Sequence, residues 1–164
     1  MNFIRCAKYF TLTGIIGFFA GRIIPKNWLS PERGLFRCFS FEKGGRIYEK
    51  LSIRSWQNKV PDMSRILPFM MPAKKLGSDY ASRLSDMIYE TCIAEIVHLL
   101  LCFSGLYCLK LWPGTAGIIV TIIYILFLNL PYILIQRYNR PRLIYLQQRH
   151  SAQAEKKKEG LCAY

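Results

Sequence analysis

Residues 115–135 read TAGIIVTIIYILFLNLPYILI, a run of 21 residues that carries no charge. An α-helix needs about 20 apolar residues to cross the hydrocarbon core of a bilayer. A second apolar run occupies residues 87–112 and includes the stretch IVHLLLCFSGLYCLKLW. Pro113 and Gly114 separate the two runs, and this dipeptide is typical of a tight turn. The sequence therefore predicts an antiparallel transmembrane hairpin over residues 87–135.

A shorter apolar stretch, YFTLTGIIGFFAGRII, lies near the N-terminus within residues 1–24. A cleaved signal peptide is the competing interpretation, because basic residues precede the apolar run. Residues 22–25 contain no small-residue cleavage site, so we favour an uncleaved membrane helix. Gly17 and Gly21 have the spacing that allows a second helix to approach closely.

The chain has 164 residues, of which 52% are hydrophobic, and a net charge of +13. This composition excludes a disordered chain and a large multidomain enzyme. The basic residues concentrate in residues 25–86 and 136–164, whereas the turn near Pro113 carries almost none. Lys and Arg accumulate on the cytoplasmic side of membrane proteins. We therefore expect a multi-pass protein of the cell membrane whose polar segment and C-terminal tail are cytoplasmic, with no nucleic-acid partner.

The polar segment, residues 25–86, is predicted to be a small α+β region. Residues 35–41 alternate in polarity like a strand, and residues 46–56 are compatible with a helix. The stretch SRILPFMMPAKKL, residues 64–76, is too short to span and is predicted to lie on the membrane surface. The expected fold is thus a mainly α integral membrane protein with about three membrane helices and this segment between them.

The six cysteines show no C-x-x-C pair, and three of them fall in one predicted span. We interpret all six as free thiols and not as a disulfide or zinc framework. They are Cys6, Cys38, Cys92, Cys102, Cys108 and Cys162.

Ionisable residues gather on one face of the second predicted span. Glu90, Glu95 and His98 share that face at the helical repeat. If the hairpin folds back at its turn, His98 lies level with Asn129, and Glu90 lies level with Arg137. Ionisable groups inside a membrane usually face a partner or a cavity, so an intramembrane site is the working hypothesis.

Several motifs resemble one family of small membrane acyltransferases. They are ETCIAEIVH at residues 90–98 and QRYNRPRL at residues 136–143, the latter preceded by Asn129 and Pro131. The pattern Phe41-Glu42-Lys43, Gly45, Lys50 and Trp56 is similar to the same family's cytoplasmic segment. The family is typified by glycosyl-4,4'-diaponeurosporenoate acyltransferase of staphyloxanthin synthesis, and the similarity covers about residues 25–145.

The resemblance implies transfer of a fatty acyl chain from a thioester to a sugar hydroxyl of a membrane glycolipid. His98 would act as general base, with Glu95 or Glu90 orienting the imidazole and Asn129 donating to the oxyanion. The expected donor is acyl-CoA or an acidic acyl carrier protein, and no further cofactor or metal is expected. The residues predicted to bind substrate are Arg137, Asn139, Arg140, Arg142, Gln136 and Trp56.

Other classes of protein remain open at this point. The acyltransferase box H-x-x-x-x-D is absent. A membrane scaffold that binds a partner through residues 25–86 would not require His98, and a small lipid methyltransferase is a further alternative. Glu95-x-x-His98 matches half of a di-iron site, but only one copy is present. Three helices make a thin bundle, which is compatible with a homo-oligomer.

Overall fold

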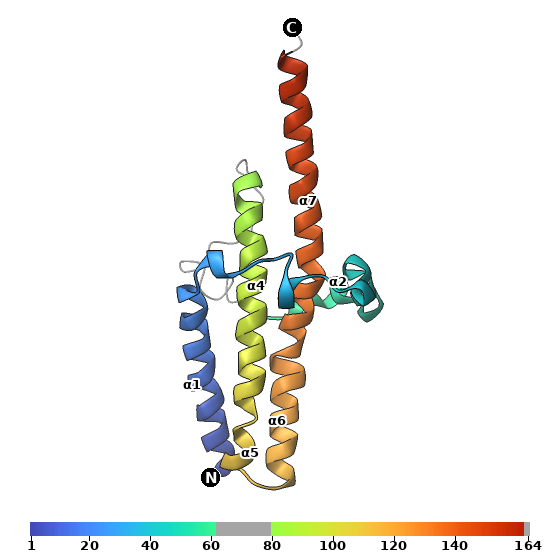
Figure 1. Ribbon diagram of the computed structural model, residues 1–164. Coiled ribbons are helices and arrows are strands. Elements are labelled where there is room, and N and C mark those ends of the chain that lie inside the picture. Colours follow the sequence, from blue (N-terminus) through green and yellow to red (C-terminus); the bar gives the residue numbers. More distant parts are fainter. Residues whose placement is uncertain (62–79, 163–164) are drawn as a thin grey trace. The chain divides into compact units, whose positions relative to one another are not determined.

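The computed structural model describes residues 1–61 and 80–162, and all regular structure in these ranges is helical (Figure 1). The prediction of a mainly α protein is therefore confirmed. The α-helices are α1 (Asn2–Ile23), α2 (Ile53–Trp56), α4 (Tyr80–Gly105), α5 (Cys108–Leu111), α6 (Thr115–Leu128) and α7 (Leu130–Cys162). The 3₁₀ helices are η1 (Lys26–Trp28), η2 (Gly34–Phe36), η3 (Ser40–Leu51) and η4 (Gln57–Lys59).

Within residues 1–61 and 80–162, three helical stretches are long and apolar enough to cross a membrane: Asn2–Ile23, Arg83–Leu111 and Thr115–Lys156. Large apolar side chains on α6 remain exposed, among them Ile118 at 50% and Phe127 at 67%. Contiguous apolar exposure of this kind is costly in water and favourable in lipid. The protein is a membrane protein, and the described part of the chain contains three candidate spans, as the hydropathy pattern predicted.

The chain forms two compact units, each built from two separate stretches. Unit 1 comprises Met1–Ser30 and Cys92–Gln136, and unit 2 comprises Pro31–Thr91 and Arg137–Tyr164. Unit 1 thus contains α1, α5, α6 and the C-terminal part of α4. Unit 2 contains the 3₁₀ helices η2, η3 and η4, together with most of α7.

Within unit 1, α1 packs closely on α4 through two glycines. A Cβ atom at Gly21 would lie 3.1 Å from a methyl group of Val97, and one at Gly17 would lie 3.3 Å from the same side chain. Even a methyl group at either position would require the Val97 side chain to shift, and a large side chain would not fit between the helices. The predicted role of the Gly17 and Gly21 pair is confirmed, and α1 is an integral part of this bundle.

A disulfide joins Cys6 of α1 to Cys108 of α5. The prediction that all six cysteines are free thiols is therefore wrong for these two. Cys38, Cys92 and Cys102 are not disulfide-bonded among the described residues. The partners are 102 residues apart in sequence, and their Cα atoms come to 5.8 Å only because the bundle folds. Sequence spacing could not have shown this pairing.

The strand predicted at residues 35–41 is absent, and the α+β description of the polar segment is wrong for the residues that the structure describes. The chain there forms η2 and then η3. Lys43, Gly44 and Gly45 have positive φ, which kinks η3 and cannot continue a strand. The buried residues of η3 are Glu42, Gly45 and Tyr48, at the three-residue repeat of a 3₁₀ helix.

Helical structure in η3 and α2 covers most of the stretch predicted to be a helix at residues 46–56. The segment predicted to lie on the membrane surface, residues 64–76, falls outside the described residues.

Candidate active site

His98 and Asn129 form a hydrogen-bonded pair inside unit 1. His98 lies on α4, and Asn129 lies at the junction of α6 and α7. The Nδ1 atom of His98 is 3.0 Å from Oδ1 of Asn129. The hairpin register predicted from the Pro113-Gly114 turn is therefore confirmed for this pair.

The hydrogen bonds of Asn129 define which nitrogen of His98 carries the proton. Nδ2 of Asn129 donates to the carbonyl oxygen of Tyr124 at 3.0 Å, and a carbonyl can only accept. Oδ1 of Asn129 therefore faces His98, whose Nδ1 must donate a proton to it. The neutral imidazole then keeps a lone pair on Nε2, which is the atom needed for general-base chemistry.

The break between α6 and α7 places the Asn129 side chain. Helix α6 ends at Leu128, and Asn129 leaves the helical region with φ −127° and ψ −48°. Pro131 has no N–H to donate to the preceding turn, which allows the interruption at this depth. Asn129 is 1% exposed, so its amide groups must be satisfied inside the protein.

The two predicted acids lie in different units. Glu95 belongs to unit 1 and is 1% exposed, while Glu90 belongs to unit 2 and is half-buried. Tyr132 stacks on His98 with ring centroids 4.4 Å apart and restricts the orientation of the imidazole. The roles predicted for Glu95 and Glu90, and that of Asn129 as oxyanion donor, stay predictions.

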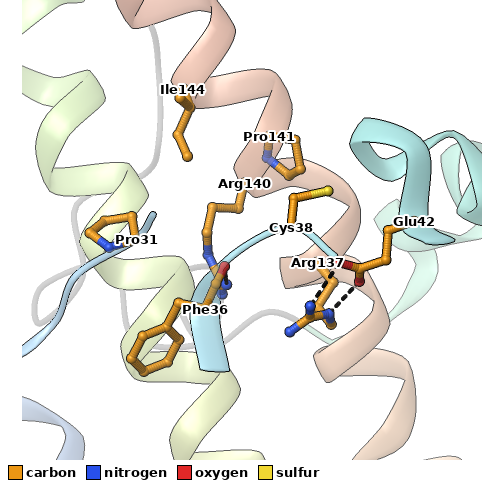
Figure 2. A pocket seen from close by; sticks show the side chains of 8 residues that line it. All are labelled: Pro31, Phe36, Cys38, Glu42, Arg137, Arg140, Pro141 and Ile144. Carbon is orange, nitrogen blue, oxygen red and sulfur yellow. Dashed lines mark hydrogen bonds and ion pairs between the residues drawn. The ribbon is translucent and has the colours of Figure 1, made fainter. Parts of the chain in front are cut away.

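In unit 2, Arg137 forms a two-pronged ion pair with Glu42 (Figure 2). Nε of Arg137 is 2.5 Å from Oε1 of Glu42, and Nη2 is 2.8 Å from Oε2. The same guanidinium donates to the carbonyl oxygens of Leu35 at 3.0 Å and Arg37 at 3.2 Å. Planar bidentate pairing of this kind holds both groups in one geometry. Arg137 thus ties α7 to the chain around η2 and η3.

Arg140 is 2% exposed and fastens α7 to α4 and η2. Its Nε donates to the hydroxyl of Thr91 at 2.9 Å, and its Nη2 donates to the carbonyl oxygen of Thr91 at 3.1 Å. Its Nη1 donates to the carbonyl oxygen of Phe36 at 2.8 Å. A buried cation with this many donors engaged acts as a cross-link.

Glu42 is ionised and stabilised where it lies. Burial by itself opposes its charge, but hydrogen bonds from Arg137, Tyr48 and the Phe39 N–H outweigh that cost and lower the pKa of Glu42 to about 2. Burial and the hydrogen bond to Glu42 raise the pKa of Tyr48 to about 12. Tyr48 is therefore a neutral donor to a charged carboxylate at physiological pH.

Arg137, Arg140 and Glu42 line a small cavity (Figure 2). The centre of a water molecule can occupy about 20 Å³ of it, which is room for roughly one water. A sugar or an acyl chain does not fit in this space. The other residues around the cavity are Pro31, Phe36, Cys38, Pro141 and Ile144.

The remaining predicted substrate-binding residues contact other protein groups within unit 2 or lie half-buried at its boundary with unit 1 in sequence. Arg142 pairs with Glu49 at 2.6 Å, and Asn139 Nδ2 lies 3.3 Å from Oε1 of Gln57. Trp56 donates from Nε1 to the carbonyl oxygen of Leu51 at 2.9 Å. Gln136 is half-buried. These residues come from separate parts of the chain, and their binding roles stay predictions.

Sequence reasoning assigned no role to Glu42, Tyr48 or Thr91. Glu42 does occur in the Phe41-Glu42-Lys43 pattern that carried part of the family resemblance. The hairpin register placed Glu90 level with Arg137, and this placement stays a prediction; the acid that the structure shows paired with Arg137 is Glu42. A carboxylate directly after the apolar Phe41, within the pattern shared with the family, is the signal that could have identified Glu42.

Comparison with known proteins identifies the family. Residues 25–149 match the family model described as glycosyl-4,4'-diaponeurosporenoate acyltransferase. Proteins of that name from Staphylococcus aureus strains N315 and MRSA252 are 29% identical over 143 residues, which is 86% of this chain and 85% of each relative. No solved structure matches. The match covers the His98–Asn129 pair and the Arg137–Glu42 ion pair. The chain therefore belongs to the glycosyl-4,4'-diaponeurosporenoate acyltransferase family and is an acyltransferase.

Proposed function

We propose that the protein transfers a fatty acyl chain from a phosphopantetheine thioester to a sugar hydroxyl of a membrane glycolipid. The relatives' name, glycosyl-4,4'-diaponeurosporenoate acyltransferase, supports a glycosyl carotenoid as the acceptor class. The donor is acyl-CoA or an acyl carrier protein. The three candidate spans are consistent with an acceptor that stays in the lipid phase.

The hydrogen-bonded chain from Tyr124 through Asn129 to His98 carries the mechanistic part of this proposal. Nε2 of His98 accepts the proton of the sugar hydroxyl as its oxygen attacks the thioester carbonyl carbon. The carbon–sulfur bond breaks, and the thiol leaves with the proton returned by His98. Asn129 orients the imidazole and stabilises its protonated form, since Oδ1 accepts from Nδ1 in both states.

In unit 2, Arg137 and Arg140 serve the reaction by holding α7, η2 and α4 in a defined arrangement. Their donors are engaged with Glu42 and with backbone carbonyls, so they contribute position and not direct phosphate binding. Loss of either residue should therefore disturb the described surface of unit 2 as a whole.

The sidedness proposed for the membrane has two supports. Lys and Arg are abundant in residues 25–86 and 136–164, which favours the cytoplasm for both. The Cys6–Cys108 disulfide, close to the hairpin turn, favours an oxidising compartment for that end of unit 1. A soluble thioester donor would then reach the protein from the cytoplasm.

Lipid mass spectrometry tests the proposal in cells that make a glycosyl carotenoid. Wild type and His98→Ala are compared at equal membrane abundance, with His150→Ala as the control for the other histidine in the chain. We expect wild type and His150→Ala to produce a glycolipid heavier by one acyl chain, and His98→Ala to produce at least a hundredfold less. Equal product from His98→Ala would refute the role of His98, and no product from wild type would refute the acceptor.

A further inference from the structure

The exposed side of η3 forms a second, larger hollow in unit 2. It has a volume of about 540 Å³ and is lined by Phe41, Lys43, Arg46, Ile47, Glu49 and Lys50. Pockets that bind small molecules have volumes in this range. The hollow is separate from the one-water cavity beside Arg137, although both include residues of η3.

The backbone of η3 brings cations and apolar groups together in this hollow. The buried side of η3 is formed by Glu42, Gly45 and Tyr48, so the residues between them lie on its exposed side. Lys43 has a φ of 48°, a conformation that costs a non-glycine residue energy and that often occurs at functional sites. The kink gathers Lys43 beside the residues of the following turn.

The chemistry of the hollow suits an anion with an apolar arm. Lys43, Arg46 and Lys50 are exposed cations, and Phe41 is 63% exposed at the same place. The single acid, Glu49, is paired with Arg142 at 2.6 Å, so its charge is largely compensated. The net potential is therefore positive next to an apolar surface.

The hollow also supplies cations for the donor's phosphate that the arginines of α7 do not supply. Arg137, Arg140 and Arg142 were among the residues predicted to bind substrate, but the first two donate to Glu42 and to backbone carbonyls, and Arg142 pairs with Glu49. A phosphate-bearing donor therefore needs other cations. Among the residues that the structure describes, Lys43, Arg46 and Lys50 form no ion pair, and Glu49 beside them is already paired with Arg142.

We propose that this hollow binds the phosphopantetheine arm of the acyl donor, with Lys43, Arg46 and Lys50 on its phosphate and Phe41 and Ile47 against its apolar part. The assignment rests on the proposed function, because it names the binding site of that reaction's donor. Acyl-CoA and acyl carrier protein share this arm, so the site serves either one. The interaction weakens as ionic strength rises.

The test is a ligand-observed NMR titration of the full-length protein in phosphatidylcholine nanodiscs. The probes are 4'-phosphopantetheine and pantetheine, which differ only by the phosphate. The variants are the triple change Lys43→Gln, Arg46→Gln and Lys50→Gln, and the control Arg54→Gln, an exposed cation outside the hollow. Arg46→Lys keeps the charge and serves as the conservative variant.

We expect wild type, Arg54→Gln and Arg46→Lys to bind 4'-phosphopantetheine at least tenfold more tightly than pantetheine. The triple variant should lose that preference while its thermal midpoint stays unchanged, because the three side chains are exposed. Equal binding of the two probes by wild type, or an undiminished preference in the triple variant, would overturn the proposal. If the triple variant loses its thermal stability, the three single variants replace it under the same criterion.

A second arm distinguishes a membrane lipid from the donor. Phosphatidylglycerol that co-purifies with each variant is measured by mass spectrometry. Loss of this lipid in the triple variant, with no phosphate preference among the probes, would assign the hollow to a lipid headgroup and refute the donor site. The titration needs no turnover, so failure of the donor site and failure of the proposed acyl transfer give separate results.

Discussion

Replacing Arg137 with Met removes the cationic partner of a carboxylate that is only 2% exposed. Against the opposing effect of burial, Arg137, Tyr48 and the Phe39 N–H together lower the pKa of Glu42 from 4.5 to about 2, with Arg137 the largest of the three; the whole shift corresponds to about 3 kcal/mol of stabilisation at neutral pH. Breaking one side of a buried ion pair typically costs a similar amount, about 3–5 kcal/mol. We therefore expect Arg137→Met to destabilise η3 locally by about 3 kcal/mol.

Hydrogen–deuterium exchange of peptides that cover residues 36–56 measures this local opening. A loss of about 3 kcal/mol corresponds to roughly a hundredfold faster exchange when opening is at equilibrium. Arg142→Met is the matched control, because Arg142 also joins α7 to a glutamate of η3 but in an exposed pair. Exposed pairs contribute about 0–1 kcal/mol, so the control should accelerate exchange less than about fivefold.

The double variant Glu42→Gln with Arg137→Met should regain part of the protection, since no unpaired charge is then buried. The reasoning is refuted if Arg137→Met exchanges within threefold of wild type at pH 7. It is also refuted if Arg137→Met and Arg142→Met have equal effects.

Three further outcomes follow from the packing, the disulfide and the shifted pKa. Gly21→Leu should lower stability by about 1–3 kcal/mol in thermal unfolding, whereas Gly14→Leu, with no atom within 4 Å of its Cβ position, should not; equal losses would contradict the packing argument. Cys6→Ser should cost about 2–4 kcal/mol in thermal unfolding and release the buried Cys108 thiol, so the denatured, unreduced variant should bind one more maleimide than wild type; equal labelling of the two would contradict the disulfide. Because the pKa of Glu42 is depressed, the stability that its charge adds is complete above pH 4.5 and is lost as pH falls toward 2. The thermal midpoint of wild type should therefore decline between pH 5 and 2 by more than that of Glu42→Gln.

The sequence was sufficient for the membrane helices and for one contact between them. Hydropathy and the Pro113-Gly114 turn predicted the hairpin, and its register placed His98 level with Asn129. Both predictions depend on local patterns, namely apolar run length and a fixed rise per residue. The Gly17 and Gly21 spacing was likewise a local signal of close helix packing.

Only the tertiary structure decided which distant residues meet. The Cys6–Cys108 disulfide and the Arg137–Glu42 ion pair join residues 102 and 95 positions apart, and no periodicity records such partners. The expected strand at residues 35–41 was wrong because positive φ at Lys43, Gly44 and Gly45 and the burial of Glu42 favour a kinked 3₁₀ helix. A short alternation of polar and apolar residues occurs in strands, but it also occurs here, next to an acid, Glu42, that is buried against the distant Arg137. The energy of that long-range pair, and not local propensity, determines the conformation there.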